Sequence, residues 1–330
     1  MSLKVSVLVL QGCSSLSSIG PMEILLKAGE LHAAAQGRSP SERFFDVRLV
    51  STGPNPVYTP SGYPVHCHAT IGAVQESDLV IVPALDGDVL AQLEGNRARI
   101  PWIRRMSERG ADVASICTGA FLLAEAGLLD GKTATTHWIA HDLFAKRYPG
   151  TRLLPEQIVV DHGRVCTSGG AMSFLTLAVY LVEKYCGAET ARYAAKIFLI
   201  DMNKGPQTCY AIFSGQRNHP DKPILETQLR IERDPFQVHS VAGLASSASM
   251  SPRNFIRRFK GATGNTPLEY IQRVRVEAAK QALEAGNDPV DTIAERIGYG
   301  DLASFRRIFK RQTGVTPTEY RTRDRYYRAG

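Results

Sequence analysis

The sequence contains neither long apolar runs nor closely spaced cysteines. The apolar stretch SFLTLAVYLV, which begins at Ser173, spans about ten residues, about half of what a membrane-crossing helix requires, and it predicts a core helix. The six cysteines show no CxxC spacing and are too sparse for a disulfide scaffold. The early segment LKVSVLVL is too short for a signal peptide's core and cleavage site, and it predicts a first strand. We therefore expect a cytoplasmic protein with reduced thiols and no membrane contact.

The first two-thirds of the chain also carries no net charge. Residues 1–221 contain 20 Lys+Arg and 20 Asp+Glu, whereas residues 222–330 contain 19 and 12. The whole surplus of +7 therefore lies in the last third of the chain. A basic surface of this kind is expected where a protein neutralises phosphates. His66 and His68 have no third ligand at a recognisable spacing, so we predict no metal site, and no pattern indicates a cofactor.

A repeated segment organises this basic region. FIRRFKGATGNTPLEY (residues 255–270) returns fifty residues later as FRRIFKRQTGVTPTEY (residues 305–320), with ten of sixteen positions identical. The phenylalanines of each copy are four residues apart, so they share one helical face, while arginine and lysine occupy the remaining surface. Such dense repetition indicates one structural unit used twice.

Capping signals place the helices of both copies. Ser251 followed by proline predicts a helix that begins there. Asp288-Pro289 opens a helix that Gly298 ends, and a second basic helix follows. Thr-Pro-x-Glu at residues 266–269 and 316–319 fits a capping box, and the first box would start a rod over residues 267–285. Each copy is predicted to be a helix-turn-helix.

The segment from about Asp234 to Arg325 resembles the DNA-binding domain of the AraC/XylS family of bacterial transcription regulators. The resemblance rests on SPRNFIRRFKGATGNTPLEYIQRVR and IAERIGYGDLASFRRIFKRQTGVTPTEY. It implies two helix-turn-helix units, joined by one helix, in consecutive major grooves of double-stranded promoter DNA. Carried over by position, the residues expected to face bases or phosphates are Arg253, Asn254, Ile256, Arg257, Lys260, Ala303, Arg306, Arg307 and Lys310.

The first two-thirds alternates short apolar runs with helical stretches. Continuous apolar strands are predicted at residues 5–10, 45–50, 79–83 and 111–116. Helices are predicted near residues 21–35 and through residues 90–106, and residues 52–68 form a loop and hairpin. This pattern favours a parallel sheet covered on both faces, in which ligands bind at the carboxyl ends of the strands.

Cys117 lies at such a strand end. A strand that runs directly into Cys-Thr-Gly-Ala and a helix has the geometry of a nucleophile elbow, where the helix N-terminus favours a thiolate. A small cysteine packed beneath the turn would fit the same sequence.

The stretch ASICTGAFLLAEAGLLDGKTATTHW (residues 114–138) resembles the PfpI/ThiJ-like, class I glutamine amidotransferase-like domain found fused to AraC-type DNA-binding domains. The resemblance implies a flavodoxin-like α/β sandwich, commonly dimeric, that serves as a sensor. Enzymes of that superfamily place a histidine after the cysteine, an acid after the first strand and Gly-Gly after the third. The corresponding positions here hold Thr118, Ser17 or Ser18, and Ala84-Leu85-Asp86. We therefore expect no catalysis.

A second candidate feature is His137-Trp138, which follows a predicted strand at residues 132–136. Its rings would suit a small ligand with an apolar or cationic part, although a tryptophan that anchors the next helix fits equally well. The residues expected to line an effector site are Cys117, Thr118, Gly119, Leu85, Asp86, His137 and Trp138.

These features predict a flavodoxin-like α/β sensor and dimerisation domain (residues 1–205), a linker (206–222) and an all-α domain with two helix-turn-helix units (223–330), whose last residues, 321–330, form a frayed tail. The predicted function is a one-component transcription regulator that responds to an amino-acid or quaternary-amine metabolite, with RNA polymerase as a further candidate partner. Two alternatives stay open: a Cys117-dependent amidase, peptidase or glyoxalase, and a Cys117 redox sensor.

Overall fold

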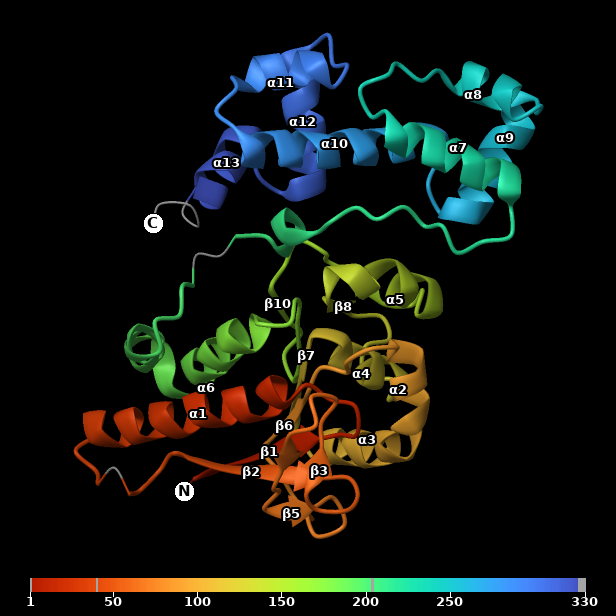
Figure 1. The fold of residues 1–330 in the computed structure, drawn as a ribbon. Helices are drawn as coiled ribbons and strands as arrows, with labels where there is room; N and C mark the ends of the chain where they lie inside the picture. The colour runs from red at the N-terminus through yellow and green to blue at the C-terminus, as the bar shows by residue number, and fades with distance from the viewer. Residues whose placement is uncertain (1, 40, 203–204, 326–330) are drawn as a thin grey trace. The chain divides into compact units, whose positions relative to one another are not determined.

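The computed structural model describes residues 2–39, 41–202 and 205–325. The chain divides into two compact units, Met1–Gln207 and Thr208–Gly330 (Figure 1). Within the described ranges, no helix is both long and apolar enough to cross a membrane. The predicted frayed tail is wrong at residues 321–325, which belong to the last helix, α13 (Pro317–Arg325). Residues 326–330 of that tail, and residues 203–204 just before the predicted linker, lie outside the described residues.

The first unit is built on a seven-stranded sheet in the order β10-β11-β7-β6-β1-β2-β5. All neighbours are parallel except β10 and β11. The strands are β1 (Leu3–Val9), β2 (Phe45–Ser51), β5 (Ala69–Thr70), β6 (Leu79–Val82), β7 (Asp112–Ile116), β10 (Val159–Asp161) and β11 (Val165–Ser168). Two small pairs lie outside this sheet: β3 (Val57–Tyr58) with β4 (Pro64–Val65), and β8 (Thr133–Ala134) with β9 (Arg152–Leu153).

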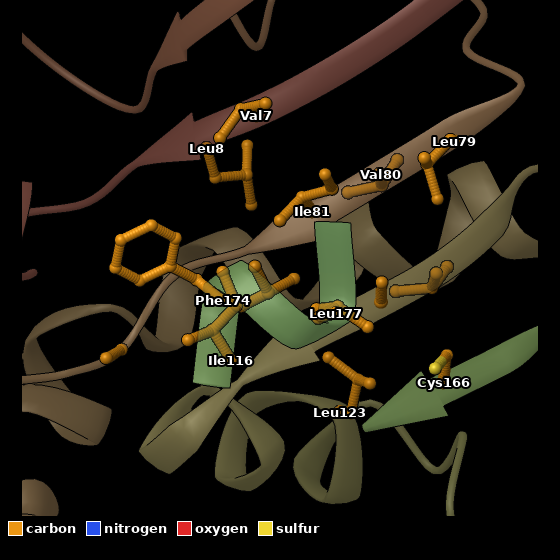
Figure 2. Packing of buried hydrophobic residues seen from close by; sticks show 14 of the residues in the cluster. Val7, Leu8, Leu79, Val80, Ile81, Ile116, Leu123, Cys166, Phe174 and Leu177 are labelled. Atoms are coloured by element: carbon orange, nitrogen blue, oxygen red, sulfur yellow. The ribbon is translucent and has the colours of Figure 1, made fainter. Parts of the chain in front are cut away.

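Helices cover both faces of the sheet, as the continuous apolar strands require. The longest, α1 (Ser15–Ala35) and α6 (Ser173–Ile197), lie together on one face, and the other face carries α2 (Val89–Gly95), α3 (Ile100–Glu108) and α4 (Ala120–Glu125) (Figure 1). Buried side chains of the central strands, such as Ile81 and Ile116, lie in one apolar core with Leu123 of α4 and with Phe174 and Leu177 of α6 (Figure 2). The predicted flavodoxin-like sandwich is confirmed.

Two helix boundaries differ from the prediction. Helix α1 begins at Ser15 rather than near Pro21, which lies inside it. The predicted helix through residues 90–106 is three segments: α2 (Val89–Gly95), a 3₁₀ turn (Arg97–Arg99) and α3 (Ile100–Glu108). The break falls at buried Asn96, whose side chain donates to the Gln11 carbonyl and to the Gln92 carbonyl. That tertiary bond favours a helix end there.

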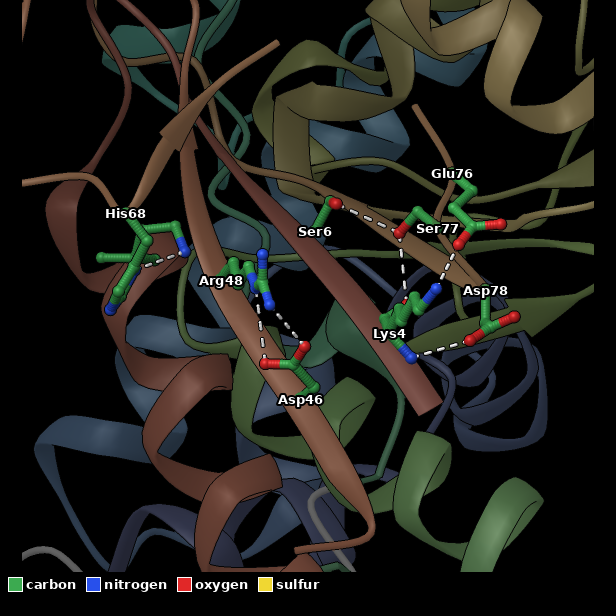
Figure 3. A network of polar contacts seen from close by, with 9 residues as sticks. Lys4, Ser6, Asp46, Arg48, His68, Glu76, Ser77 and Asp78 are labelled. Carbon is green, nitrogen blue, oxygen red and sulfur yellow. Dashed lines mark hydrogen bonds and ion pairs between the residues drawn. The ribbon is translucent and has the colours of Figure 1, made fainter. Parts of the chain in front are cut away.

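Polar side chains connect neighbouring strands of the sheet (Figure 3). The Lys4 amide donates to Asp78 Oδ2 at 2.7 Å, and Ser77 Oγ lies 3.1 Å from Ser6 Oγ. His68 Nδ1 accepts a bond from the Leu49 amide at 3.0 Å. In the described part of the chain, no group of three or more His, Cys, Asp or Glu is arranged to hold a metal ion. The bonds of Lys4 and Ser77 join the amino end of β1 to the segment that enters β6, and the His68 bond joins β2 to the start of β5.

The second unit is all helical. It comprises α7 (Lys222–Arg233), α8 (Val241–Ser247), α9 (Pro252–Thr263), α10 (Pro267–Ala285), α11 (Val290–Arg296), α12 (Leu302–Thr313) and α13 (Pro317–Arg325). The predicted rod is α10, and it contacts α7, α9, α11, α12 and α13. Both predicted capping boxes form, since Thr266 and Glu269, and likewise Thr316 and Glu319, exchange side-chain and backbone hydrogen bonds.

The repeat is also visible in the two helical cores. In the first copy, the rings of Phe255 and Phe259 are 5.5 Å apart and Tyr270 follows at 5.3 Å; in the second, the corresponding distances among Phe305, Phe309 and Tyr320 are 5.7 and 5.6 Å. These six aromatic residues are buried. The two helix-turn-helix units, α8–α9 and α11–α12, therefore rest on equivalent aromatic clusters on either half of α10.

Candidate functional site

Cys117 occupies a strained elbow between β7 and α4 (Ala120–Glu125). Its φ is 58°, which is a costly conformation for a residue with a side chain. A β-carbon at Gly119 would lie 2.5 Å from the Pro83 carbonyl oxygen, so only glycine allows the turn to approach β6 this closely. The local geometry is that of the predicted nucleophile elbow.

The residue after the cysteine is committed to a structural role. Thr118 Oγ1 accepts a hydrogen bond from the Leu85 amide at 2.8 Å and donates to the Leu85 carbonyl at 2.7 Å. Both residues are buried. The hydroxyl thereby joins the elbow to the segment after β6, at the position where peptidase-like relatives carry a histidine.

The backbone amides directly after β6, in the region of the expected oxyanion donors, already have hydrogen-bond acceptors. The Ala84 amide donates to Ser17 Oγ at 3.0 Å, and the Leu85 amide is held by Thr118. Ser17 stands in the region where an acid is expected, and its hydroxyl donates to the Ser14 carbonyl. The neighbouring Ser18 hydroxyl donates to the Leu8 carbonyl. Side-chain oxygens thus satisfy the groups that catalysis would use.

The thiol of Cys117 is held in its neutral form. Its pKa is raised to about 11, chiefly because the side chain is buried; hydrogen bonds with Thr118 lower the pKa and the charge of Asp86 raises it, and neither effect outweighs burial. Asp86 itself is exposed, and its amide donates to the Gly12 carbonyl at 2.9 Å. A cavity of about 500 Å³ opens elsewhere on the first unit, beside Met22 and Phe45.

His137 and Trp138 are positioned next to the elbow by Thr136, whose hydroxyl donates to the Cys117 carbonyl at 3.0 Å. Their rings lie 5.2 Å apart, and both side chains are partly exposed. His137 Nδ1 accepts a bond from the Ile139 amide at 3.1 Å, and burial lowers the pKa of the ring. The expected strand is shorter than predicted and pairs with β9 rather than with the main sheet.

Sequence reasoning missed Gln207, which is almost fully buried at the same edge. Its Nε2 donates to Thr135 Oγ1, to the Thr136 carbonyl and to the Gln157 carbonyl at 2.8–3.1 Å, while its Oε1 is buried without a partner among the described residues. Gln207 falls where the sequence predicts a linker, and no pattern marks it as a buried residue. One hydrogen-bonded path therefore runs from Gln207 through Thr136 to Cys117.

In the second unit, the residues expected to face DNA lie along α9 and α12. All are exposed except Asn254, which is partly exposed, and Ile256 remains 39% exposed despite its apolar side chain. Arg257 Nη2 donates to Asn254 Oδ1 at 2.8 Å, and Arg307 Nη2 donates to Ser304 Oγ at 3.4 Å. The two arginines, which occupy the same position of the repeat, are thus oriented in the same way.

Helix ends fix both recognition helices. Ser251 Oγ caps α9 through the Asn254 amide, and the Asp301 carboxylate caps α12 through the amides of Ala303 and Ser304. Gly264 and Gly314 end the helices with φ of 73° and 80°, in the left-handed region that glycine adopts at little cost. Each basic helix is thereby held on its aromatic cluster with its charged face outward.

An amidotransferase-like elbow in one unit and two helix-turn-helix motifs in the other define a class of protein, a DNA-binding regulator with an α/β sensor-type domain. Residues 3–184 match the DJ-1/PfpI family, and residues 244–323 match a helix-turn-helix domain of AraC type. The chain therefore belongs to the DJ-1/PfpI family in its first unit. It is an AraC-family transcription regulator that binds DNA through its second unit.

Curated relatives are named as HTH-type transcriptional regulators. The chain is 24% identical to the HTH-type transcriptional regulator CdhR of Pseudomonas aeruginosa over 95% of its own length and 90% of that protein. It is 30% identical to the HTH-type transcriptional regulator Rv1931c of Mycobacterium tuberculosis, over 74% of this chain and 94% of that one. It is 28% identical to the HTH-type transcriptional regulator GlxA of Rhizobium meliloti, over 67% and 68%.

Solved structures agree on the fold. An AraC family transcriptional regulator from Pseudomonas putida superposes with a TM-score of 0.51 at 19% identity, over 59% of this chain and 99% of that one. A ThiJ/PfpI family protein from Pseudomonas syringae gives a TM-score of 0.51 at 20% identity, over 61% and 76%. At these identities the likeness concerns the fold alone.

Proposed function

We propose that the first unit is a non-catalytic sensor that binds a small cationic metabolite at the edge formed by Cys117, Leu85, Asp86, His137 and Trp138. Binding there changes how the DNA-binding unit is held, and so changes transcription. A ligand has this effect only if it prefers one arrangement of the protein over another.

The observation that carries this proposal is the internal bonding of the elbow. The amides of Ala84 and Leu85 are already bonded to Ser17 and Thr118, so they are not free to stabilise a developing negative charge. Catalysis by a cysteine also requires a thiolate and a nearby base, whereas the Cys117 pKa of about 11 leaves the thiol protonated at neutral pH. This environment disfavours both the hydrolase and the redox-sensor alternatives.

The charge and rings at the same edge support a cationic ligand. The Asp86 carboxylate is exposed and close enough to the elbow for its charge to affect the Cys117 thiol. The Trp138 ring is partly exposed beside His137, and an indole face attracts ammonium and quaternary ammonium groups. Amino-acid or quaternary-amine metabolites combine the required positive charge with small size.

Gln207 supports a route from this edge to the rest of the chain. Its amide contacts the segment that also bonds Cys117, and it is the last residue of the first unit. We expect ligand binding beside Trp138 to alter the bonds of Thr136 and thereby those of Gln207. The residues that follow Gln207 lead into the DNA-binding unit.

The remaining parts of the proposal concern partners. We propose that the chain acts as a homodimer in the cytoplasm, that the exposed side chains along α9 and α12 contact bases and phosphates, and that the promoter-bound protein contacts RNA polymerase. The family resemblance supports the dimer, and the naming of the relatives as transcriptional regulators supports the promoter role. Sedimentation equilibrium of the full chain tests the dimer, because a single species of 36.1 kDa at micromolar concentration would contradict it.

Thermal-shift measurements on the full chain test the sensor. Glycine betaine, choline, arginine and other amines are added singly, and a binding compound raises the melting temperature of the first unit. Asp86→Asn and Trp138→Leu are expected to abolish the shift, whereas Cys117→Ser is expected to keep it. Hydrolysis of amide or glyoxal substrates by the wild-type chain, lost in Cys117→Ser, would overturn the proposal. So would a shift that survives both site variants.

A further inference from the structure

The two recognition helices are not held in the same way, although their sequences repeat. Position 258 of the first copy is arginine, and the equivalent position 308 of the second copy is isoleucine. Ile308 is 8% exposed and belongs to the apolar core around Phe305 and Phe309. The first copy therefore lacks one of the three apolar contacts that fix the second recognition helix.

An ion pair takes the place of that contact. Arg258 Nε and Nη2 donate to the two carboxylate oxygens of Asp221 at 2.9 and 2.7 Å, which is the bidentate arrangement. The Asp221 side chain is 19% exposed and that of Arg258 is 35% exposed. The pair holds the Asp221 pKa below its ordinary value, so the carboxylate is charged at neutral pH.

Asp221 is also the N-cap of α7, since its Oδ1 accepts from the Ile224 amide at 3.4 Å. One carboxylate therefore joins the first recognition helix α9 to the start of α7. Its charge is balanced by Arg258, and the α9 arginines and lysine that are expected to face DNA remain exposed.

We infer that Arg258 is a positioning residue rather than a DNA contact: through Asp221 it sets the orientation of α9, and so it controls recognition by the first helix-turn-helix alone. The inference concerns how this protein reads DNA and does not depend on the proposed effector. Since α12 is fixed by Ile308 instead, the second recognition helix is independent of the pair.

Because Arg258 and Asp221 carry opposite charges, variants of the two residues distinguish a positioning role from a phosphate contact. Removing the arginine charge weakens DNA binding under either account. Asp221→Asn removes a negative charge, so electrostatics alone would strengthen DNA binding or leave it unchanged. If the pair positions α9, Asp221→Asn instead weakens specific binding, because the bidentate geometry is lost while the neutral side chain still caps α7.

The experiment uses the full chain and duplexes that it selects from a random DNA pool. Arg257→Ala and Arg307→Ala first assign each half of the selected sequence to one recognition helix. Binding of Asp221→Asn, Arg258→Gln and the double variant that combines them is then measured on the parent duplex and on duplexes altered in one half. Arg230→Gln, which removes a charge from α7, is the matched control, since Arg230 bonds Ser247 rather than Asp221.

Each single variant is expected to discriminate about two- to fivefold less well between the parent duplex and one altered in the first half, the effect expected for loss of one partly exposed ion pair. Discrimination in the second half stays unchanged, and the double variant loses no more than either single variant. Tighter or unchanged binding by Asp221→Asn would overturn the inference and make Arg258 a phosphate contact. Equal losses in both halves, with a lower melting temperature, would also overturn it, because the pair would then serve general stability.

Discussion

Thr118→Val offers a direct test of the bonding that closes the elbow. Valine keeps the shape of threonine but removes the hydroxyl that both accepts from the Leu85 amide and donates to its carbonyl. Leu85 is 4% exposed, so both backbone groups would be left buried without partners. Each unsatisfied buried group costs about 1–3 kcal/mol, and the variant should therefore lose about 2–6 kcal/mol of unfolding free energy.

Tryptophan fluorescence during urea unfolding of the full chain isolates this effect, because both tryptophans, Trp102 and Trp138, lie in the first unit. Thr118→Ser keeps the hydroxyl and is the control, with an expected loss of about 1 kcal/mol for one methyl group. DNA binding, which belongs to the second unit, should be retained in both variants at low urea. A loss below 1 kcal/mol for Thr118→Val would refute the reasoning, since Leu85 would then have other partners.

The remaining predictions concern the thiol and the recognition helices. Alkylation of Cys117 at pH 7, followed by peptide mapping, should be slower than that of an ordinary thiol of pKa about 8.5 by about 300-fold, because a pKa of about 11 lowers the thiolate fraction by that factor. Reaction at the ordinary rate would show that the thiol is not held in its neutral form. Because the folded-state pKa of Cys117 is raised, its contribution to the unfolding free energy is complete below a pH of about 8.5 and is lost as the pH rises towards about 11. The variant Cys117→Ala should therefore show a smaller decline in unfolding free energy at alkaline pH. An unchanged pH profile would contradict this. Arg257→Ala and Arg307→Ala should each weaken binding to a selected duplex by about 1–3 kcal/mol if the arginine contacts a base. An equal loss on all sequences, with the slope of log affinity against log salt concentration reduced by about one, would instead indicate a phosphate contact.

The sequence predicts the second unit well because its signals are local. Ser251 with Pro252, and the Thr-x-x-Glu pairs at 266 and 316, determine where helices begin through bonds within a few residues. The resulting helices, α9 and α10, start where the sequence indicates. The Arg258–Asp221 pair could not be predicted, because it joins residues 37 positions apart and the arginine looks like one more surface charge.

The first unit is predicted well in its strands and less well at its carboxyl edge. Continuous apolar runs mark buried strands whatever their order. The predicted start of α1 is wrong. Pro21 suits the first turn of a helix, whereas tertiary hydrogen bonds of Ser17 and Ser18 favour a helix that begins at Ser15. The roles of Thr118 and Gln207 depend on contacts 33 to 72 residues away, which single-sequence patterns do not encode.

The two helix-turn-helix units bind specific DNA, and the salt dependence of that binding is the most direct measurement of it. Binding of the full chain to a selected duplex and to a scrambled duplex is measured by fluorescence anisotropy. The logarithm of the affinity should fall linearly with the logarithm of the salt concentration, and the selected duplex should be preferred at each salt concentration. The double variant Arg257→Ala with Arg307→Ala should lose that preference. If no duplex shows salt-sensitive binding, or if the double variant discriminates as well as the wild-type chain, the account is contradicted.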